Sequence, residues 1–212
     1  MEFLPPEIQQ YSENHTSSES NLLQKITRDT FAKVLMPRML SGNLQGQLLS
    51  VFSHMLQPKC ILEIGTFTGY SAICLANGLT EGGKLITIDI NEELEERVSA
   101  YFKEANLDHK IDYRIGDALA IIPELSNTFD LVFIDADKEN YAAYYHLVIN
   151  KVRSGGFIIA DNVLWSGKVT DATKQDKDTL AVRAFNDLVQ ADNRVENILL
   201  PVRDGLMIAR KI

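Results

Sequence analysis

Cysteine is scarce in this chain of 212 residues, which contains only Cys60 and Cys74. Two scattered cysteines do not make the disulfide framework of a small secreted domain. Both lie in apolar segments, where free cysteines are usually buried, so we expect two reduced thiols. The chain is therefore expected to work in a reducing compartment, which indicates the cytoplasm.

Long apolar runs and an excess of positive charge are also missing. No stretch approaches the run of about eighteen apolar residues that a membrane span needs. The first residues, MEFLPPEIQQYSENHT, lack the basic and apolar regions of a secretory signal. The net charge of −8 disfavours tight nonspecific binding to phosphate backbones. A membrane is therefore not expected as a partner, and the charge disfavours a nucleic acid as a partner.

The arrangement of apolar residues predicts an α/β fold. With 45% hydrophobic residues, the chain is expected to form a single domain over residues 1–212, with a helical N-terminal extension over 1–40. Helices are predicted at 20–36, 43–57, 70–79, 92–106, 139–152 and 178–191, and strands at 60–64, 84–88, 111–115, 129–134, 157–160, 195–200 and 205–210. Gly155-Gly156 is predicted to be a turn. Strands that alternate with helices form a parallel sheet. Such sheets bind ligands at the carboxyl ends of their strands.

A glycine-containing loop follows the first predicted strand. Gly65 and Gly69 permit a tight turn and a close approach of the backbone to a ligand, although a purely structural turn is the alternative. Their spacing is G-x-x-x-G, which differs from the G-x-G-x-x-G of a dinucleotide site, and no Walker lysine follows. The loop therefore favours a ligand without a diphosphate.

Two further strand ends are typical of an adenosine site. Asp89 follows the second strand, where a carboxylate can accept hydrogen bonds from both ribose hydroxyls. Its alternative role is a helix N-cap, because Asp89 and Asn91 both precede a predicted helix. After the third strand, the small Ala118 can lie against an adenine, while the neighbouring Asp117 can also act as a cap. The three loops together indicate adenosine more specifically than any one of them.

Oxygen-bearing side chains follow the fourth and fifth strands. Asp135 follows one strand, and Asp161 and Asn162 follow the other. Neighbouring parallel strands bring such ends together, and oxygen ligands select a hard cation such as Mg²⁺, Ca²⁺ or Mn²⁺. Neither loop contains histidine or cysteine, which argues against zinc. Helix capping is the alternative, but clustered carboxylates repel one another unless a cation or proton compensates them.

Lys138 is a candidate catalytic residue. It stands three positions after Asp135, at a spacing that places both side chains on one face of a turn opening a helix. An ammonium group close to a metal can have a lowered pKa and accept a proton. The alternative is a solvated surface lysine.

These motifs resemble the class I O-methyltransferases of the caffeoyl-CoA and catechol type, which use S-adenosylmethionine (SAM). The resemblance extends from about Met39 to Ile212 and is carried by EIGTFTGYS, DADKENY, ADNVLWSGKV and LPVRDGLMIARK. It implies a Rossmann-like fold with a seven-stranded, mostly parallel sheet, an antiparallel last strand and helices on both faces. It also implies a homodimer.

The resemblance implies a role for particular residues. The residues implied to contact SAM are Ser41, Glu63, Gly65, Ser71, Asp89, Ala118 and Asp135. Those implied to hold the divalent cation are Asp135, Asp161 and Asn162. Lys138 and Asp135 are implied to be catalytic, and Arg38 and Trp165 are implied to line the acceptor pocket.

The resulting hypothesis is a metal-dependent O-methyltransferase acting on a vicinal-dihydroxy aromatic, either catechol-like or hydroxycinnamoyl. A cation chelated by two adjacent hydroxyls would lower their pKa. One alternative is a tRNA hydroxyuridine methyltransferase, for which Arg28, Lys33 and Arg38 would supply a basic face. A more distant alternative is a non-catalytic nucleotide-binding module, which would make the acid cluster a coincidence.

Overall fold

The computed structural model describes residues 5–212. They form two compact units, an N-terminal unit over residues 6–117 and a C-terminal unit over residues 118–212 together with Pro5. The expected N-terminal extension begins in residues 1–4, which lie outside the described residues. The expectation of a single domain over residues 1–212 stays a prediction.

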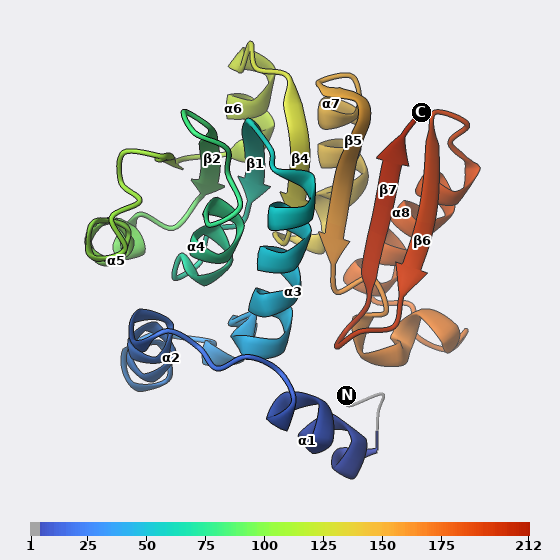
Figure 1. Cartoon of the computed structure of the whole chain (residues 1–212). Coiled ribbons are helices and arrows are strands. Elements are labelled where there is room, and N and C mark those ends of the chain that lie inside the picture. Colours follow the sequence, from blue (N-terminus) through green and yellow to red (C-terminus); the bar gives the residue numbers. More distant parts are fainter. Residues whose placement is uncertain (1–4) are drawn as a thin grey trace. The chain divides into compact units, whose positions relative to one another are not determined.

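The N-terminal unit contains five helices and three strands within its described residues (Figure 1). Its elements are α1 (Pro6–Asn14), α2 (Asn21–Lys33), α3 (Gly42–Leu56), β1 (Cys60–Ile64), α4 (Tyr70–Ala76), β2 (Lys84–Asp89), α5 (Glu95–Glu104) and β3 (Ile111–Ile115). Two short 3-10 helices, η1 (Pro37–Met39) and η2 (Glu92–Leu94), precede α3 and α5. The strands are parallel, and β2 pairs with both β1 and β3.

The C-terminal unit contributes α6 (Ala118–Glu124), β4 (Phe129–Ile134), α7 (Tyr141–Ile149), β5 (Val152–Asp161), α8 (Lys177–Ala191), β6 (Val195–Leu200) and β7 (Leu206–Lys211) (Figure 1). Its 3-10 helices are η3 (Lys138–Asn140) and η4 (Trp165–Thr170). β4 and β5 are parallel, whereas β7 runs antiparallel to both β5 and β6. The seven-stranded sheet has the order β3-β2-β1-β4-β5-β7-β6, which confirms the predicted mostly parallel α/β fold with an antiparallel last strand.

Most predicted elements are confirmed, and the exceptions have local causes. The strands at 60–64, 111–115 and 129–134 begin and end where predicted. The turn predicted at Gly155-Gly156 is wrong, because both glycines lie inside β5, where its register with β4 shifts. The pattern missed α1, which buries no residue, and α6, which contains Pro123. No helix of the described residues has the length and apolar character needed to cross a bilayer.

Two glycines allow α3 and α4 to pack closely in the N-terminal unit. A Cβ added to Gly46 would lie 2.5 Å from a ring carbon of Tyr70, and one added to Gly78 would lie 2.3 Å from the backbone of Ser53. Cys60 and Cys74 are not joined in a disulfide, and burial raises the pKa of the Cys74 thiol to about 12. Cys74 is therefore an unreactive core thiol at neutral pH, as expected for a buried cysteine.

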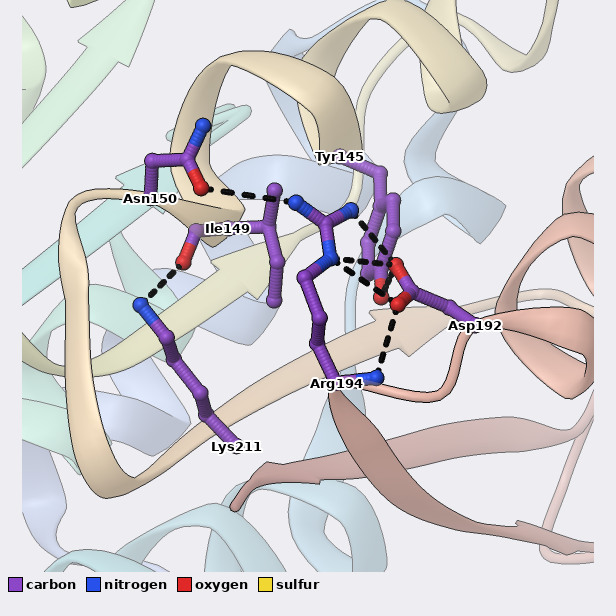
Figure 2. Close-up of polar contacts among 6 residues, drawn as sticks. All are labelled: Tyr145, Ile149, Asn150, Asp192, Arg194 and Lys211. Atoms are coloured by element: carbon purple, nitrogen blue, oxygen red, sulfur yellow. Dashed lines mark hydrogen bonds and ion pairs between the residues drawn. The ribbon is translucent and has the colours of Figure 1, made fainter.

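A polar cluster joins α7, α8 and the last two strands of the C-terminal unit. Figure 2 shows the Arg194 guanidinium against the Asp192 carboxylate, with a shortest distance of 2.6 Å. The Tyr145 hydroxyl donates to the same carboxylate at 2.9 Å. Lys211 donates to the carbonyl of Ile149 at 2.9 Å, and so caps the end of α7. These contacts fix the end of α8 and the end of β7 against α7.

The Asp192 cluster predicts a loss of stability in acid. The Arg194 side chain, with help from the Tyr145 hydroxyl, holds the pKa of Asp192 well below its ordinary value. A carboxyl with a depressed folded-state pKa stabilises the fold above its unfolded pKa of about 3.9, and this stabilisation is lost as the pH falls further. We expect Asp192→Asn to melt about 2–4 °C below the wild type at pH 7. The gap should begin to narrow as the pH falls below about 4, and it should close only when the pH passes the much lower folded-state pKa.

Thermal melting from pH 7 to pH 3 checks this expectation. Asp112→Asn is the matched control, because Asp112 also pairs with an arginine two residues later, Arg114, but does so on the surface. An Asp192→Asn variant that melts with the wild type at every pH would contradict the role given to this pair.

Candidate active site

The glycine loop after β1 has an unusual backbone that β2 helps to hold. Its residues Gly65, Phe67 and Gly69 have φ values of 98°, 47° and 80°. Asp89, at the end of β2, accepts a hydrogen bond from the Phe67 N–H at 2.7 Å and another from the Asn91 N–H at 2.9 Å. Asn91, and not Asp89, is the N-cap of η2. A carboxylate has about four acceptor positions, so Asp89 keeps capacity for ligand hydroxyls.

A buried acid lies beside this loop. Glu63, at the end of β1, is fully buried. Its carboxylate accepts from the Thr87 hydroxyl at 2.5 Å, and the Thr87 oxygen lies 2.5 Å from that of Thr66. Because β1 and β2 pair with Glu63 opposite Thr87, the sheet register sets this chain of hydrogen bonds. A rigid acid is thus placed at the carboxyl end of β1.

The remaining residues predicted for cofactor and acceptor contact are dispersed over several elements. Ser41 is buried at the N-cap of α3, and Ser71 is buried in the first turn of α4. Arg38 lies exposed in η1, and Ala118 is the buried first residue of α6 in the C-terminal unit. The structure thus places Ser41, Ser71 and Arg38 in the same unit as Glu63.

The second group of predicted residues lies together at the carboxyl ends of β4 and β5. These strands are parallel, and Ile134 pairs with Ala160, so Asp135 and Asp161 are the next residues in register. Asp161 is only 3% exposed, whereas 22% of the Asp135 side chain is exposed. The N-caps of η3 and η4 are Asp137 and Leu164, so none of the three predicted metal ligands caps these helices.

Lys138 is buried against this acid cluster and is not a solvated surface lysine. Its ammonium donates to the Tyr141 hydroxyl at 2.5 Å, to the Ala136 carbonyl at 3.0 Å and to the Asp135 carboxylate at 3.3 Å. An ammonium group has three donors, and here three acceptors match them. The nitrogen also lies 5.7 Å from the centre of the Trp165 ring. These contacts fix the Lys138 nitrogen between Asp135 and the indole.

Tyr141 connects Lys138 to the end of β5, a role that sequence reasoning missed. Its fully buried hydroxyl accepts from Lys138 and donates to the Asp161 carbonyl at 2.9 Å. Burial, followed by the negative charges of Asp135 and Asp161, raises the pKa of this hydroxyl well above its ordinary value. The group therefore stays protonated and can serve as a donor. Its place in the DADKENY segment, three residues after Lys138, was the available signal.

The donor set at the ends of β4 and β5 fits a hard cation. Two carboxylates and the amide oxygen of Asn162 are the ligand types that Mg²⁺, Ca²⁺ and Mn²⁺ accept. Within residues 5–212, the Asn162 side chain makes no hydrogen bond. The same part of the chain holds no group of three or more His, Cys, Asp and Glu side chains arranged for a metal. A cation here would therefore need the Asn162 amide oxygen or other oxygen ligands in addition to the two carboxylates.

Comparison with known proteins shows which class of protein has this sequence and fold, namely the O-methyltransferases. The sequence fits the O-methyltransferase family over residues 13–212. It is 33% identical to a probable caffeoyl-CoA O-methyltransferase 2 of Dictyostelium discoideum, over 97% of this chain and 91% of the relative. It is 36% identical to the catechol O-methyltransferase domain-containing protein 1 of Mus musculus, over 99% and 82%.

A solved structure matches as well. The O-methyltransferase TomG from Streptomyces achromogenes, in complex with SAM, has a TM-score of 0.88 and 30% identity, covering 97% of this chain and 96% of that one. The chain belongs to the O-methyltransferase family and is a SAM-dependent O-methyltransferase. This result removes the alternative of a non-catalytic nucleotide-binding module. The roles of the individual site residues stay predictions.

Proposed function

We propose that this O-methyltransferase requires a divalent cation and methylates one hydroxyl of a vicinal-dihydroxy aromatic, either catechol-like or hydroxycinnamoyl. The observation that carries the proposal is the cluster at the ends of β4 and β5, where buried Lys138 contacts Asp135 and is linked through Tyr141 to Asp161. Chelation by two adjacent hydroxyls would explain why such an acceptor is selected. The caffeoyl-CoA and catechol names of the relatives agree with this acceptor class.

The protein's own residues would hold the reactants and move one proton. Asp135, Asp161 and Asn162 would hold the cation, and Trp165 would line the acceptor pocket. When bound, SAM supplies the electrophilic methyl group, and the cation lowers the pKa of a coordinated hydroxyl. Lys138 in its neutral amine form would receive the released proton at Nζ and so become the ammonium that donates to its three acceptors. Holding an oxygen nucleophile in line with the methyl group can contribute roughly 7–11 kcal/mol.

The N-terminal unit supplies residues suited to SAM. Asp89 would accept from the ribose hydroxyls, and Glu63 would face the amino group of the methionine part. Gly65 has no Cβ and adopts a positive φ, so the backbone of the loop can approach the cofactor closely at this position. Ser41, Ser71, Ala118 and Asp135 would complete the contacts, and Arg38 would contribute to the acceptor pocket.

A homodimer belongs to the same proposal. Large apolar side chains are exposed on the segment from α2 to η1, namely Phe31, Leu35, Met36 and Met39, and on α3 at Val51 and Met55. A second copy would cover such a patch. Light scattering should then give twice the chain mass of 23.8 kDa. The cytoplasmic location is a separate expectation, based on two reduced thiols, and it stays a prediction.

A methyl-transfer screen tests the proposed function. Purified protein and SAM are offered catechols, hydroxycinnamoyl esters and tRNA, with Mg²⁺ and after chelator treatment. We expect transfer to the vicinal diols only when the metal is present. Transfer to tRNA alone would favour the hydroxyuridine alternative, against which the net charge of −8 already argues. Undiminished transfer after chelation would refute the metal requirement.

The hydroxyl of Tyr141 provides a milder test of the same cluster. Tyr141→Phe keeps the ring that packs edge-on against Phe185, but removes both hydrogen bonds that join Lys138 to the Asp161 carbonyl. Loss of two buried hydrogen bonds costs about 1–3 kcal/mol, which lowers the melting temperature by a few degrees. We expect kcat to fall about tenfold, equivalent to about 1.4 kcal/mol. Tyr145→Phe is the control, because its hydroxyl contacts Asp192 instead. Equal rates in the two variants would contradict the link.

A further inference from the structure

The loop between β5 and α8, residues 162–176, begins with two residues of the proposed active site, Asn162 and Trp165. Its backbone is left-handed at Asn162, Trp165 and Ser166, with φ values of 59°, 48° and 54°. Residues other than glycine adopt this conformation only when surrounding contacts impose it. The loop geometry therefore depends on bonds from outside the loop.

The second half of the loop has no apolar anchor. Every residue from 170 to 177 is exposed to solvent. Hydrophobic burial therefore cannot hold this stretch against the rest of the C-terminal unit. Polar contacts must position it.

One side chain on α8 supplies most of these contacts. The Arg183 guanidinium donates from Nε to the Val169 carbonyl at 3.0 Å and from Nη1 to the Lys174 carbonyl at 2.9 Å. Its Nη2 donates to the carbonyls of Lys168 at 2.9 Å and Asp171 at 2.5 Å. A guanidinium has five donors in a rigid plane, and four of them here bind one loop. The loop is therefore folded around the Arg183 guanidinium.

The first half of the loop is held from two other directions. Asp204, in the turn between β6 and β7, accepts from the Ser166 N–H at 2.5 Å through its side chain and from the Leu164 N–H at 2.9 Å through its carbonyl. Asn186 of α8 donates to the Val163 carbonyl at 2.9 Å. Asp204 therefore holds both neighbours of Trp165, and the carbonyls bound by Arg183 begin three residues after it, at Lys168.

We propose that Arg183 is a positioning residue for the acceptor side of the active site. It holds the backbone of residues 168–174 and thereby fixes the direction of Trp165, whose ring lies 5.7 Å from the Lys138 nitrogen. The indole N–H of Trp165 is buried without a hydrogen-bond partner in the described part of the chain, so a fixed indole offers one donor to an acceptor oxygen. The inference rests on the proposed function for the roles of Trp165 and Asn162.

Limited proteolysis tests whether Arg183 holds the loop of residues 162–176, and it does so without relying on catalysis. Trypsin can cut after Lys168, Lys174 and Lys177 only when the loop opens locally. We expect Arg183→Met to raise the cleavage rate at these sites about tenfold, measured by mass spectrometry well below the melting temperature. Arg210→Met is the matched control, because Arg210 makes an exposed ion pair with Glu196 and no contact with the loop. Its cleavage rate should equal that of the wild type.

Kinetics test the consequence for the active site. A misplacement of about 1 Å can cost up to about a hundredfold in rate, so we expect kcat/KM for a catechol acceptor to fall about 10–100-fold in Arg183→Met. The dissociation constant of SAM should change less than about twofold, because Asp89 and Glu63, the proposed ribose and methionine contacts, lie in another unit. A merely structural role would instead lower the melting temperature and leave the kinetic constants of the folded fraction unchanged.

A second variant covers the case in which Arg183→Met does not fold. Arg183→Lys keeps the charge, but its three donors share one nitrogen and cannot reach four carbonyls. Faster loop cleavage together with a lower acceptor kcat/KM in either folded variant supports the proposed role of Arg183. Wild-type cleavage or wild-type acceptor kinetics in Arg183→Lys overturns it. If the wild-type enzyme methylates no catechol, the proposed function fails, whereas the cleavage assay still decides whether Arg183 holds the loop.

Discussion

Asp161→Ala is expected to abolish metal-dependent methyl transfer while leaving SAM binding largely intact. Asp161 is buried at the end of β5 and would provide one of only two carboxylates to the cation. Cation stabilisation of developing charge contributes several kcal/mol, so its loss should reduce kcat by at least about 10³-fold. The methyl donor should still bind, because its proposed ribose contact, Asp89, is held separately by the glycine loop.

The measurement has two parts and a matched control. Calorimetry gives the SAM affinity, and a catechol methylation assay is run after chelator treatment and again after Mg²⁺ is restored. Asp137→Ala removes another carboxylate of the same cluster, whose oxygens are already bonded to Tyr144 and Asn140. It should lose less than about tenfold in rate. An Asp161→Ala enzyme with full activity after chelation would show that the metal assignment is wrong.

Lys138→Met is expected to reduce kcat by about 10²–10⁴-fold, the usual contribution of a general base. The substitution keeps the length of the apolar stem but removes the nitrogen that lies between Asp135 and Tyr141. KM for SAM should change little, because the proposed acceptor deprotonation involves no contact with the ribose or adenine. The initial rate at saturating acceptor and metal is the measurement.

Two further variants distinguish proton transfer by Lys138 from an effect of its positive charge. Lys168→Met removes an ammonium that lies 5.8 Å from the centre of the Trp165 ring, close to the 5.7 Å of Lys138, but pairs with Asp176 instead of the acid cluster. It should keep most of the activity. Lys138→Arg keeps a positive charge that proteins do not deprotonate. Wild-type rates in Lys138→Arg would rule out Lys138 as the base and leave it an electrostatic role only.

Local sequence patterns were sufficient to locate the strands and to identify the residues at their carboxyl ends. The strands at 60–64, 111–115 and 129–134 were predicted to the residue because each is a short apolar run between clear breaks. Once alternating strands and helices implied parallel pairing, Asp135 and Asp161 had to lie at one edge of the sheet. The structure places them there in register.

Local patterns failed where backbone geometry or a distant partner decided the outcome. Gly155-Gly156 looked like a turn, but pairing with β4 drew both glycines into β5. The helix α1 buries no side chain and therefore has no apolar stripe to read. Helix capping was an alternative for Asp89, and only the structure showed its bond to the loop N–H of Phe67.

The sequence by itself determined the α/β order, the acids that end β4 and β5, and a lysine three residues after Asp135. Those features follow from chain periodicity and from spacings of a few residues. Only the tertiary structure decided that Lys138 is buried, that Tyr141 joins it to Asp161, and that Arg183 holds the loop of Trp165. These contacts join residues up to 20 positions apart, and their formation depends on how whole elements pack, which no local pattern records.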